Sequence, residues 1–120
     1  MFLEYSPIFV FVKDAQIRSV YLSRNYEQML GMPLTEVLGK TMDELFPSEM
    51  AKKMIEDDKS VLREGKPCEV VEEFAGKTFV TTKFPIFVEG EAAFVAGFTM
   101  DITAQKKMEQ SLLEKNLQLQ

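Results

Sequence analysis

The side chain best placed for chemistry in this sequence is a carboxylate set in apolar surroundings. Asp58 falls in the apolar stripe of segment 49–64, whose spacing predicts a helix. The other members of the stripe are Ala51, Met54, Ile55, Val61 and Leu62. Burying a bare carboxylate is costly, so the pattern predicts a cationic partner for Asp58. The candidate partners are Lys83, Arg18 and Arg24.

A pair between Asp58 and Lys83 beside a cleft would bind the polar end of a ligand. The alternative is a structural ion pair, or a carboxylate that stays partly exposed. Strand alternation argues against Lys83, because in segment 78–88 this residue lies opposite the more apolar face. That face carries Val80, Thr82, Phe84 and Ile86. The sequence leaves both interpretations open.

Other catalytic and metal-binding chemistry has little support in the residue types. The chain contains no histidine, which removes the usual metal ligand, haem ligand and general base. It has no glycine-rich phosphate loop and no nucleophile elbow. An enzyme working through Asp or Glu alone is an alternative that loss of turnover on changing Asp58 would support. We therefore expect no catalytic residues, no metal site and no enzymatic activity.

Net charge and the lengths of the apolar runs limit the partners. The formal net charge of −5 argues against nucleic acid and against an anionic membrane surface. The longest apolar run, 92–98, is too short to span a bilayer, and "MFLEYSP" lacks the features of a signal peptide. The single Cys68 cannot form an internal disulfide, and its one basic neighbour, Lys66, favours an ordinary strand cysteine over an oxidant sensor. We expect a cytoplasmic domain without nucleic-acid or direct membrane contact.

The apolar runs and the glycines predict the elements that position these residues. Strands are expected over 7–12, 18–23, 68–74, 78–88 and 92–102. A short helix capped by Ser23 should stop at Gly31, and two one-turn helices should follow it. A longer helix over 49–64 should be capped by Ser48 and ended by Gly65. Short connectors make the strand pairs antiparallel with the helices on one face, so the fold class is α+β.

In this order the segments resemble a PAS domain, the small sensor module of signalling proteins. The resemblance covers the chain from about Leu3 to Leu113. It rests on "VKDAQIRSVYLSRNYEQMLG", "LTEVLGKTMDELFP", "LREGKP", "TTKFPIF" and, most specifically, "GFTMDITAQKKMEQSL". It implies a five-stranded antiparallel sheet with short helices on one face and a C-terminal output helix. On this basis residues 1–103 are a sensor domain and residues 104–120 an amphipathic linker helix.

The resemblance also implies a ligand cavity between the sheet and the helices. The candidate pocket residues are Tyr21, Tyr26, Met29, Met54, Asp58, Lys83 and Phe98. Two positions depart from the family: Ser23 stands where Asn is frequent, and Ile17 where Gly is frequent, which suggests a different hairpin geometry. The reactive-cysteine motif of flavin photosensors is absent, and haem-binding relatives use a His, so both cofactors are disfavoured and the cofactor is unknown. Alternatively the ten Phe and eight Met residues fill the core, which would give a ligand-free dimerisation or protein-interaction module.

The end of the chain predicts how a signal would leave the domain. Asp101, Ile102 and Thr103 match the family's closing motif, and a cap at this point would couple the last strand to the output helix. In that helix Met108, Leu112 and Leu119 form a seam suited to a coiled coil between two copies. The alternative is a helix that folds back or frays. We expect a homodimer cut from a longer parent chain, whose effector would be a histidine kinase, a diguanylate cyclase or a transcription regulator.

Overall fold

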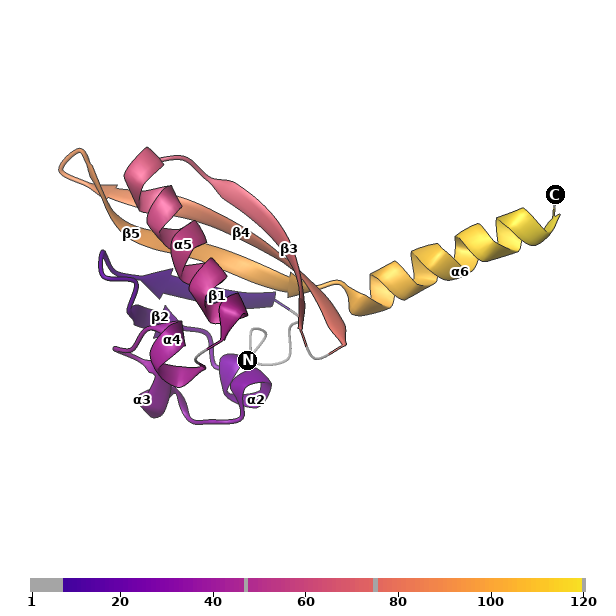
Figure 1. Ribbon diagram of the computed structural model, residues 1–120, viewed down its shortest axis with the longest axis horizontal. Coiled ribbons are helices and arrows are strands. Elements are labelled where there is room, and N and C mark those ends of the chain that lie inside the picture. The colour runs from indigo at the N-terminus through magenta and orange to yellow at the C-terminus, as the bar shows by residue number, and fades with distance from the viewer. Residues whose placement is uncertain (1–7, 47, 75, 120) are drawn as a thin grey trace.

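The computed structural model describes residues 8–46, 48–74 and 76–119, within which five antiparallel strands form one sheet (Figure 1). The strands are β1 (Ile8–Lys13), β2 (Ser19–Leu22), β3 (Cys68–Phe74), β4 (Lys77–Val88) and β5 (Glu91–Asp101). Their order across the sheet is β2-β1-β5-β4-β3, so the last strand lies in the middle with the first beside it. The predicted fold class and all five predicted strands are confirmed. Pro7, the expected first residue of β1, lies outside the described residues.

Five helices are described, and four of them lie between β2 and β3 in the chain. They are α2 (Tyr26–Leu30), α3 (Leu34–Val37), α4 (Met42–Leu45), α5 (Glu49–Glu64) and, after the sheet, α6 (Thr103–Leu119). Gly31 and Gly65 end α2 and α5 in the left-handed conformation, as predicted, because glycine adopts a positive φ without a Cβ clash. The Ser48 side chain accepts a hydrogen bond from the Ala51 N–H at 3.2 Å and caps α5, also as predicted.

Ser23 does not cap α2, so that prediction was wrong. Its hydroxyl accepts a hydrogen bond from the Val10 N–H at 2.9 Å and donates one to Asn25. Asn25 occupies the N-cap position without a side-chain cap bond, and its amide donates to the Ile8 carbonyl at 2.6 Å. The polar pair therefore connects the start of α2 to β1. Burial explains the difference, because both side chains face the β1 backbone, which offers them partners there.

Ile17 keeps the left-handed backbone that glycine would adopt freely at this turn. Its φ is 64°, which is unusual for a β-branched residue, and its side chain is almost fully buried. The turn is fixed by Asp14, whose Oδ1 accepts hydrogen bonds from the backbone N–H groups of Gln16 and Arg18. Apolar burial and these Asp14 bonds offset the local cost of the positive φ.

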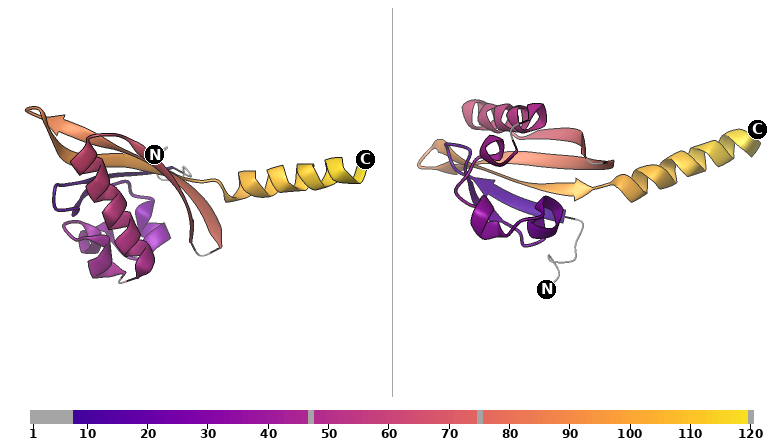
Figure 2. Two further views of the ribbon diagram at one scale, coloured as in Figure 1. Left: turned by 45° about the horizontal axis from the view of Figure 1, so that its top comes forward. Right: turned by 60° about the horizontal axis from the view of Figure 1, so that its bottom comes forward.

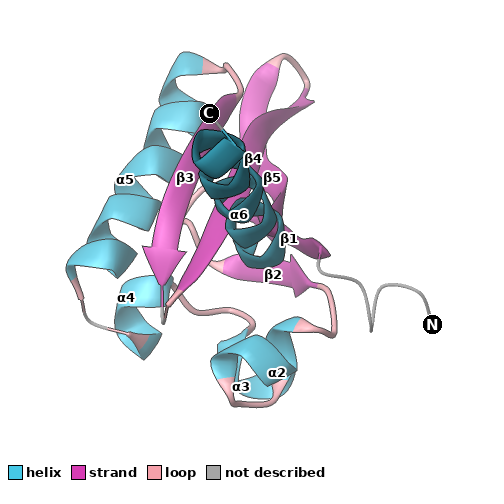
Figure 3. Cartoon of the chain, turned by 90° about the vertical axis from the view of Figure 1, so that its right-hand side faces the viewer, coloured by secondary structure: helices cyan, strands magenta, loops and turns pink. Residues whose placement is uncertain are grey.

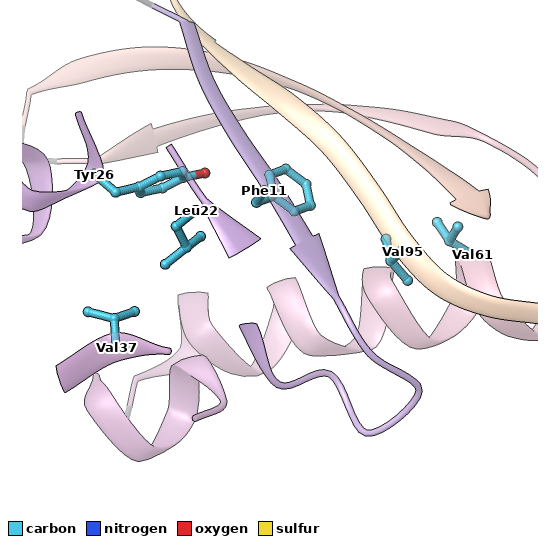
Figure 4. Close-up of a cluster of buried hydrophobic side chains, with 6 residues drawn as sticks. All are labelled: Phe11, Leu22, Tyr26, Val37, Val61 and Val95. Carbon is cyan, nitrogen blue, oxygen red and sulfur yellow. The ribbon is translucent and has the colours of Figure 1, made fainter. Parts of the chain in front are cut away.

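A small apolar core joins the sheet to the helices (Figure 4). Its buried members are Phe11, Leu22, Tyr26, Val37, Val61 and Val95. Figure 3 shows α5 and α4 on the left of the strands, with α2 and α3 below them. Phe9 of β1 contacts the ring of Tyr26 at a centroid distance of 5.2 Å, which places α2 against the same face of the sheet that α5 covers.

The other face of the sheet is apolar and open. Its exposed large side chains, between 37% and 61% accessible, are Tyr21, Val71, Phe84, Ile86, Phe98 and Met100. Cross-strand pairing places them on one side: Phe84 lies opposite Ala96, and Val12 pairs with both Ala96 and Tyr21. The face of β4 that is richer in apolar residues therefore points away from the helices.

The C-terminal helix α6 projects from the body of the domain in both views of Figure 2. The molecule extends 57 Å along its longest axis and 32 Å and 31 Å along the others. Its radius of gyration of 16.4 Å exceeds the value of about 14 Å expected for a compact chain of this length. The described side chains of α6 from residue 104 to residue 115 are exposed. Folding back onto the sheet, one of the alternatives considered for this helix, is not seen.

Candidate functional site

A cavity of about 520 Å³ lies between the helices and the inner face of the sheet. Most of its wall is apolar and comes from Phe11, Leu22, Tyr26, Met29, Leu30, Met42, Leu45, Phe46, Met50, Ala51, Met54 and Phe79. The polar side chains that border it are Lys13, Ser48, Glu72, Thr81, Lys83 and Thr99. An apolar pocket of this size with a few converging polar groups has the usual make-up of a small-molecule site.

A buried ionic cluster of Lys13, Asp58 and Lys83 closes one part of this cavity. Lys13 Nζ lies 2.7 Å from Asp58 Oδ2, and Lys83 Nζ lies 2.8 Å from Asp58 Oδ1. All three side chains are at least 96% buried. Lys83 Nζ also donates to the Met54 carbonyl at 3.4 Å. The cluster joins β1, α5 and β4, and it brings two lysine side chains to one carboxylate.

The positions of the two lysines follow from the strand pairing. In β1, Phe9, Phe11 and Lys13 alternate onto the inner face. Gly97 of β5 pairs with Phe11 on one side and with Lys83 on the other. A Cβ at position 97 would overlap the carbonyl oxygen of Thr82 and lie 2.7 Å from Cζ of Phe11. Because Gly97 has no side chain, the Phe11 ring can lie over it, close to the neighbouring strand β4.

Burial and hydrogen bonding set the electrostatics of the cavity wall. Desolvation lowers the pKa of Lys13, and the neighbouring Asp58 carboxylate opposes this effect. Desolvation likewise raises the pKa of Tyr26, whose hydroxyl forms a hydrogen bond with Thr99. The Thr99 hydroxyl lies 2.8 Å from that of Thr81. The cavity thus has a chain of neutral hydroxyls beside its ionic cluster.

The structure brings most of the predicted pocket residues together. Tyr26, Met29, Met54 and Lys83 line the cavity. Asp58 accepts hydrogen bonds from both lysines and is not among the residues that line the cavity. The cationic partner predicted for Asp58 is present and fully buried.

Two predicted pocket residues lie elsewhere. Tyr21 is 48% exposed and Phe98 is 37% exposed, and both belong to the outer face of the sheet. Strand alternation explains this, because Tyr21 pairs with Val12 and Phe98 with Val10, which face away from the helices.

Sequence reasoning missed Lys13, and its alternation argument against Lys83, a residue it had proposed as partner of Asp58, was wrong. The alternation "FVFVK" places Lys13 in phase with Phe11, which was the available signal. The sequence correctly predicted that Lys83 lies on the face of β4 opposite Val80, Thr82, Phe84 and Ile86. The error was to take that more apolar face as the core side. Of the other proposed partners of Asp58, Arg18 instead forms an ion pair with Asp14 at 2.9 Å, and Arg24 is exposed.

The predicted coupling residues form a compact junction between β5 and α6. Asp101 Oδ1 accepts hydrogen bonds from the Thr103 N–H at 3.0 Å and from the Thr103 hydroxyl at 2.6 Å. The same hydroxyl oxygen accepts the Thr78 N–H at 2.8 Å, and the Ile102 N–H donates to the Thr78 carbonyl at 2.9 Å. The hydrogen bonds from Thr103 lower the pKa of Asp101. The first residue of α6 is therefore tied to both β5 and β4.

Of the predicted dimer seam in α6, Met108 is 66% exposed and Leu112 is 59% exposed. Leu119 belongs to the same helix, but its side chain is outside the described part of the chain. Cys68 is half-buried at the start of β3, and burial raises the pKa of its thiol, which fits an unreactive strand cysteine. Across the described ranges, no group of three His, Cys, Asp or Glu side chains is arranged to hold a metal ion, and no helix has the length and apolar character needed to cross a membrane.

An antiparallel sheet with short helices over one face, a cavity between them and a projecting terminal helix define a single-sheet α+β module. The sequence profile of the PAS fold family matches residues 3–107, and the chain belongs to this family. The resemblance inferred from the sequence motifs is thereby confirmed. None of the curated proteins compared with the chain matches it.

Solved structures of signalling proteins share the fold. The PAS domain of Bordetella pertussis BvgS is 21% identical with a TM-score of 0.73, over 97% of this chain and 92% of that one. A sensory box sensor histidine kinase from Vibrio cholerae is 18% identical with a TM-score of 0.70, over 80% of this chain and 82% of that one. The Vibrio cholerae VqmA structure, a complex with ligand and DNA, is 22% identical with a TM-score of 0.70, over 83% of this chain and 48% of that one. The chain thus has the fold of the PAS domains found in sensor kinases.

Proposed function

We propose that this domain is a non-enzymatic sensor that binds a small molecule in its cavity and relays the change through α6. The effector would lie elsewhere in the parent chain and would be a histidine kinase, a diguanylate cyclase or a transcription regulator. The proposed setting is the cytoplasm, and the working unit is a homodimer. The solved relatives support the effector part of this proposal, since the PAS fold occurs in sensor kinases.

The cavity of about 520 Å³ is the observation that supports ligand binding most directly. It falls in the range of roughly 300–1,000 Å³ that is usual for small-molecule pockets. A core filled by its own Phe and Met side chains, the alternative expected from composition, would leave no such space. Met29, Met42, Met50 and Met54 line the cavity, and their flexible thioethers allow the walls to adapt to a guest.

The relay rests on contacts that connect the cavity to α6. Thr99 borders the cavity, and two residues later in β5 Asp101 caps the start of α6 through Thr103. A ligand that displaces the Thr99–Thr81 hydroxyl pair would shift β5 relative to β4. Because Thr103 is bonded to both strands, such a shift would change the direction of α6.

Two exposed apolar surfaces support a homodimer. One is the outer face of the sheet around Phe84 and Phe98, and the other is the α6 seam at Met108 and Leu112. Isolated helices of this length are only marginally stable in water, so a second α6 packed along the seam would stabilise both.

Native mass spectrometry of the purified domain tests the proposal. A dimer that carries extra non-covalent mass, absent from the denatured spectrum, is the expected result. Ala51→Phe, which fills the cavity from α5, should remove this mass, whereas Lys59→Phe on the exposed side of the same helix should retain it. A monomer at the bare chain mass would favour the ligand-free interaction module. Bound mass that is unchanged in Ala51→Phe would favour it too, because the bound molecule would then lie outside the cavity.

A further inference from the structure

With both lysines protonated, the ionic cluster in the cavity wall carries one positive charge more than Asp58 balances. Asp58 is the shared acceptor of Lys13 and Lys83, so its two oxygens are already used by the two ammonium groups. Each ammonium has three N–H donors. Lys13 donates one of them to Asp58, and Lys83 donates one to Asp58 and one, over a longer distance, to the Met54 carbonyl. Both lysines therefore have donors left for a guest. Both lysines line the cavity, whereas Asp58 does not.

A buried ammonium without a full counter-charge is expensive in a desolvated site, and for this reason burial lowers the pKa of Lys13. A negative charge beside Lys13 would favour its protonated form. The arrangement favours a guest that brings one negative charge to Lys13 and Lys83. The rest of the wall is apolar, with Phe11, Met54 and Phe79 among its members. A guest that also has an apolar body would therefore gain both from the charge and from the burial of its hydrocarbon part.

We propose, on the basis of the sensor function above, that the cavity binds an amphipathic monocarboxylate whose carboxylate is held by Lys13 and Lys83. A dianion such as a phosphate monoester fits less well, because the cluster has a single excess positive charge. An uncharged guest would leave that excess unbalanced, and a cationic guest would add to it.

Glu72 is the other charged side chain at the cavity and works against the anion. It lies on β3, raises the pKa of Lys13 through its charge, and is half-buried, so solvent screens it more than the fully buried cluster. The negative charge of a bound anion would raise the pKa of Lys13 and so offset the effect of desolvation. Replacement of Glu72 by Gln should therefore strengthen anion binding, with a smaller effect than changes within the cluster.

Octanoate, 1-octanol and octylammonium each have eight carbon atoms but head groups of different charge. Comparing their affinities separates the contribution of charge from that of apolar burial. Affinity is measured by isothermal titration calorimetry with protein that has been unfolded, stripped of any bound mass and refolded. Octanoate should bind about 10- to 100-fold more tightly than 1-octanol, as expected for a charge-assisted hydrogen bond in a dry site. Octylammonium should bind more weakly than 1-octanol.

Two variants of the cluster should change octanoate affinity in opposite directions. Lys13→Met leaves Asp58 paired with Lys83 and removes the excess charge, so octanoate affinity should fall to that of 1-octanol. Asp58→Asn removes the counter-charge and should raise octanoate affinity in the fraction that stays folded. Lys59→Met, an exposed lysine of α5, serves as the control and should change nothing.

The outcomes distinguish this proposal from the sensor proposal. Equal binding of octanoate and 1-octanol, no binding of octanoate, or unchanged octanoate binding by Lys13→Met would overturn the carboxylate assignment. Native spectra that then show a neutral or cationic bound molecule would leave the sensor function intact. Native spectra at the bare chain mass would count against both.

Discussion

Lys83 Nζ donates to Asp58 Oδ1 at 2.8 Å and so connects the middle of β4 to α5 through a buried ion pair. Asp58 also accepts a hydrogen bond from Lys13, so two lysines from different strands share one carboxylate. This sharing makes the three members unequal, because loss of either lysine leaves a pair, whereas loss of Asp58 leaves two buried cations.

Removal of Asp58 should therefore be the most damaging change in the cluster. We expect Asp58→Ala to lower the free energy of unfolding by about 3–5 kcal/mol, the usual cost of leaving a buried charge unpaired. Lys13→Met should cost less, because Asp58 keeps Lys83 as its partner. Urea unfolding followed by circular dichroism measures both values. Equal losses in the two variants would mean that Lys83 alone is not a sufficient partner for Asp58.

Gly97 should not tolerate even the smallest side chain. We expect Gly97→Ala to lower the free energy of unfolding by about 1–3 kcal/mol, because the new Cβ would overlap the Thr82 carbonyl oxygen and press on the Phe11 ring. Phe11→Leu in the same background should restore only part of the loss, since the clash with the Thr82 backbone remains. Thermal unfolding of the single and double variants measures this. Full restoration would place the conflict in the Phe11 ring alone.

The Thr103 hydroxyl should hold the start of α6 on the sheet. Thr103→Val removes its hydrogen bond to Asp101 and its acceptance of the Thr78 N–H, and should cost about 1–2 kcal/mol. In Thr103→Val we expect faster hydrogen exchange at the Thr78 amide, which loses its acceptor. Thr103→Ser keeps the hydroxyl and both bonds, and serves as the matched control. An amide at Thr78 that stays as protected in Thr103→Val as in the native chain would mean that the strand pairing alone holds this junction.

The same junction should weaken in acid. The folded-state pKa of Asp101 is lowered by its bonds from Thr103, so its contribution is present above the unfolded-state pKa and is lost as the pH falls through the folded-state value. The difference in unfolding free energy between the native chain and Asp101→Asn should therefore shrink as the pH falls below about 4. Urea titrations of both proteins across acid pH measure it. A difference that does not change with pH would show that the negative charge of Asp101 is not what stabilises the cap.

The sequence predicted the elements well because most carried local signals. Ser48 and Gly65 delimited α5, and alternation delimited β5. The site was harder, since it depends on which side of each strand meets the helices. In β4 the outer face carries more apolar residues than the inner face and was therefore taken as the core side. The inner face carries Thr81 and Lys83, whose partners lie on β5 and α5. Such partners are distant in sequence, and alternation alone does not reveal them.

The α6 seam provides the most direct test of the proposed dimer. Leu112→Lys places a charge where two helices would meet, so we expect dissociation to monomers with α6 otherwise unchanged. Gln110→Lys makes the same substitution away from the Met108–Leu112 line and should leave the dimer intact. Sedimentation velocity reports the association state, and circular dichroism reports the helix content. A dimer that survives Leu112→Lys but is lost in Phe98→Lys would instead place the interface on the outer face of the sheet.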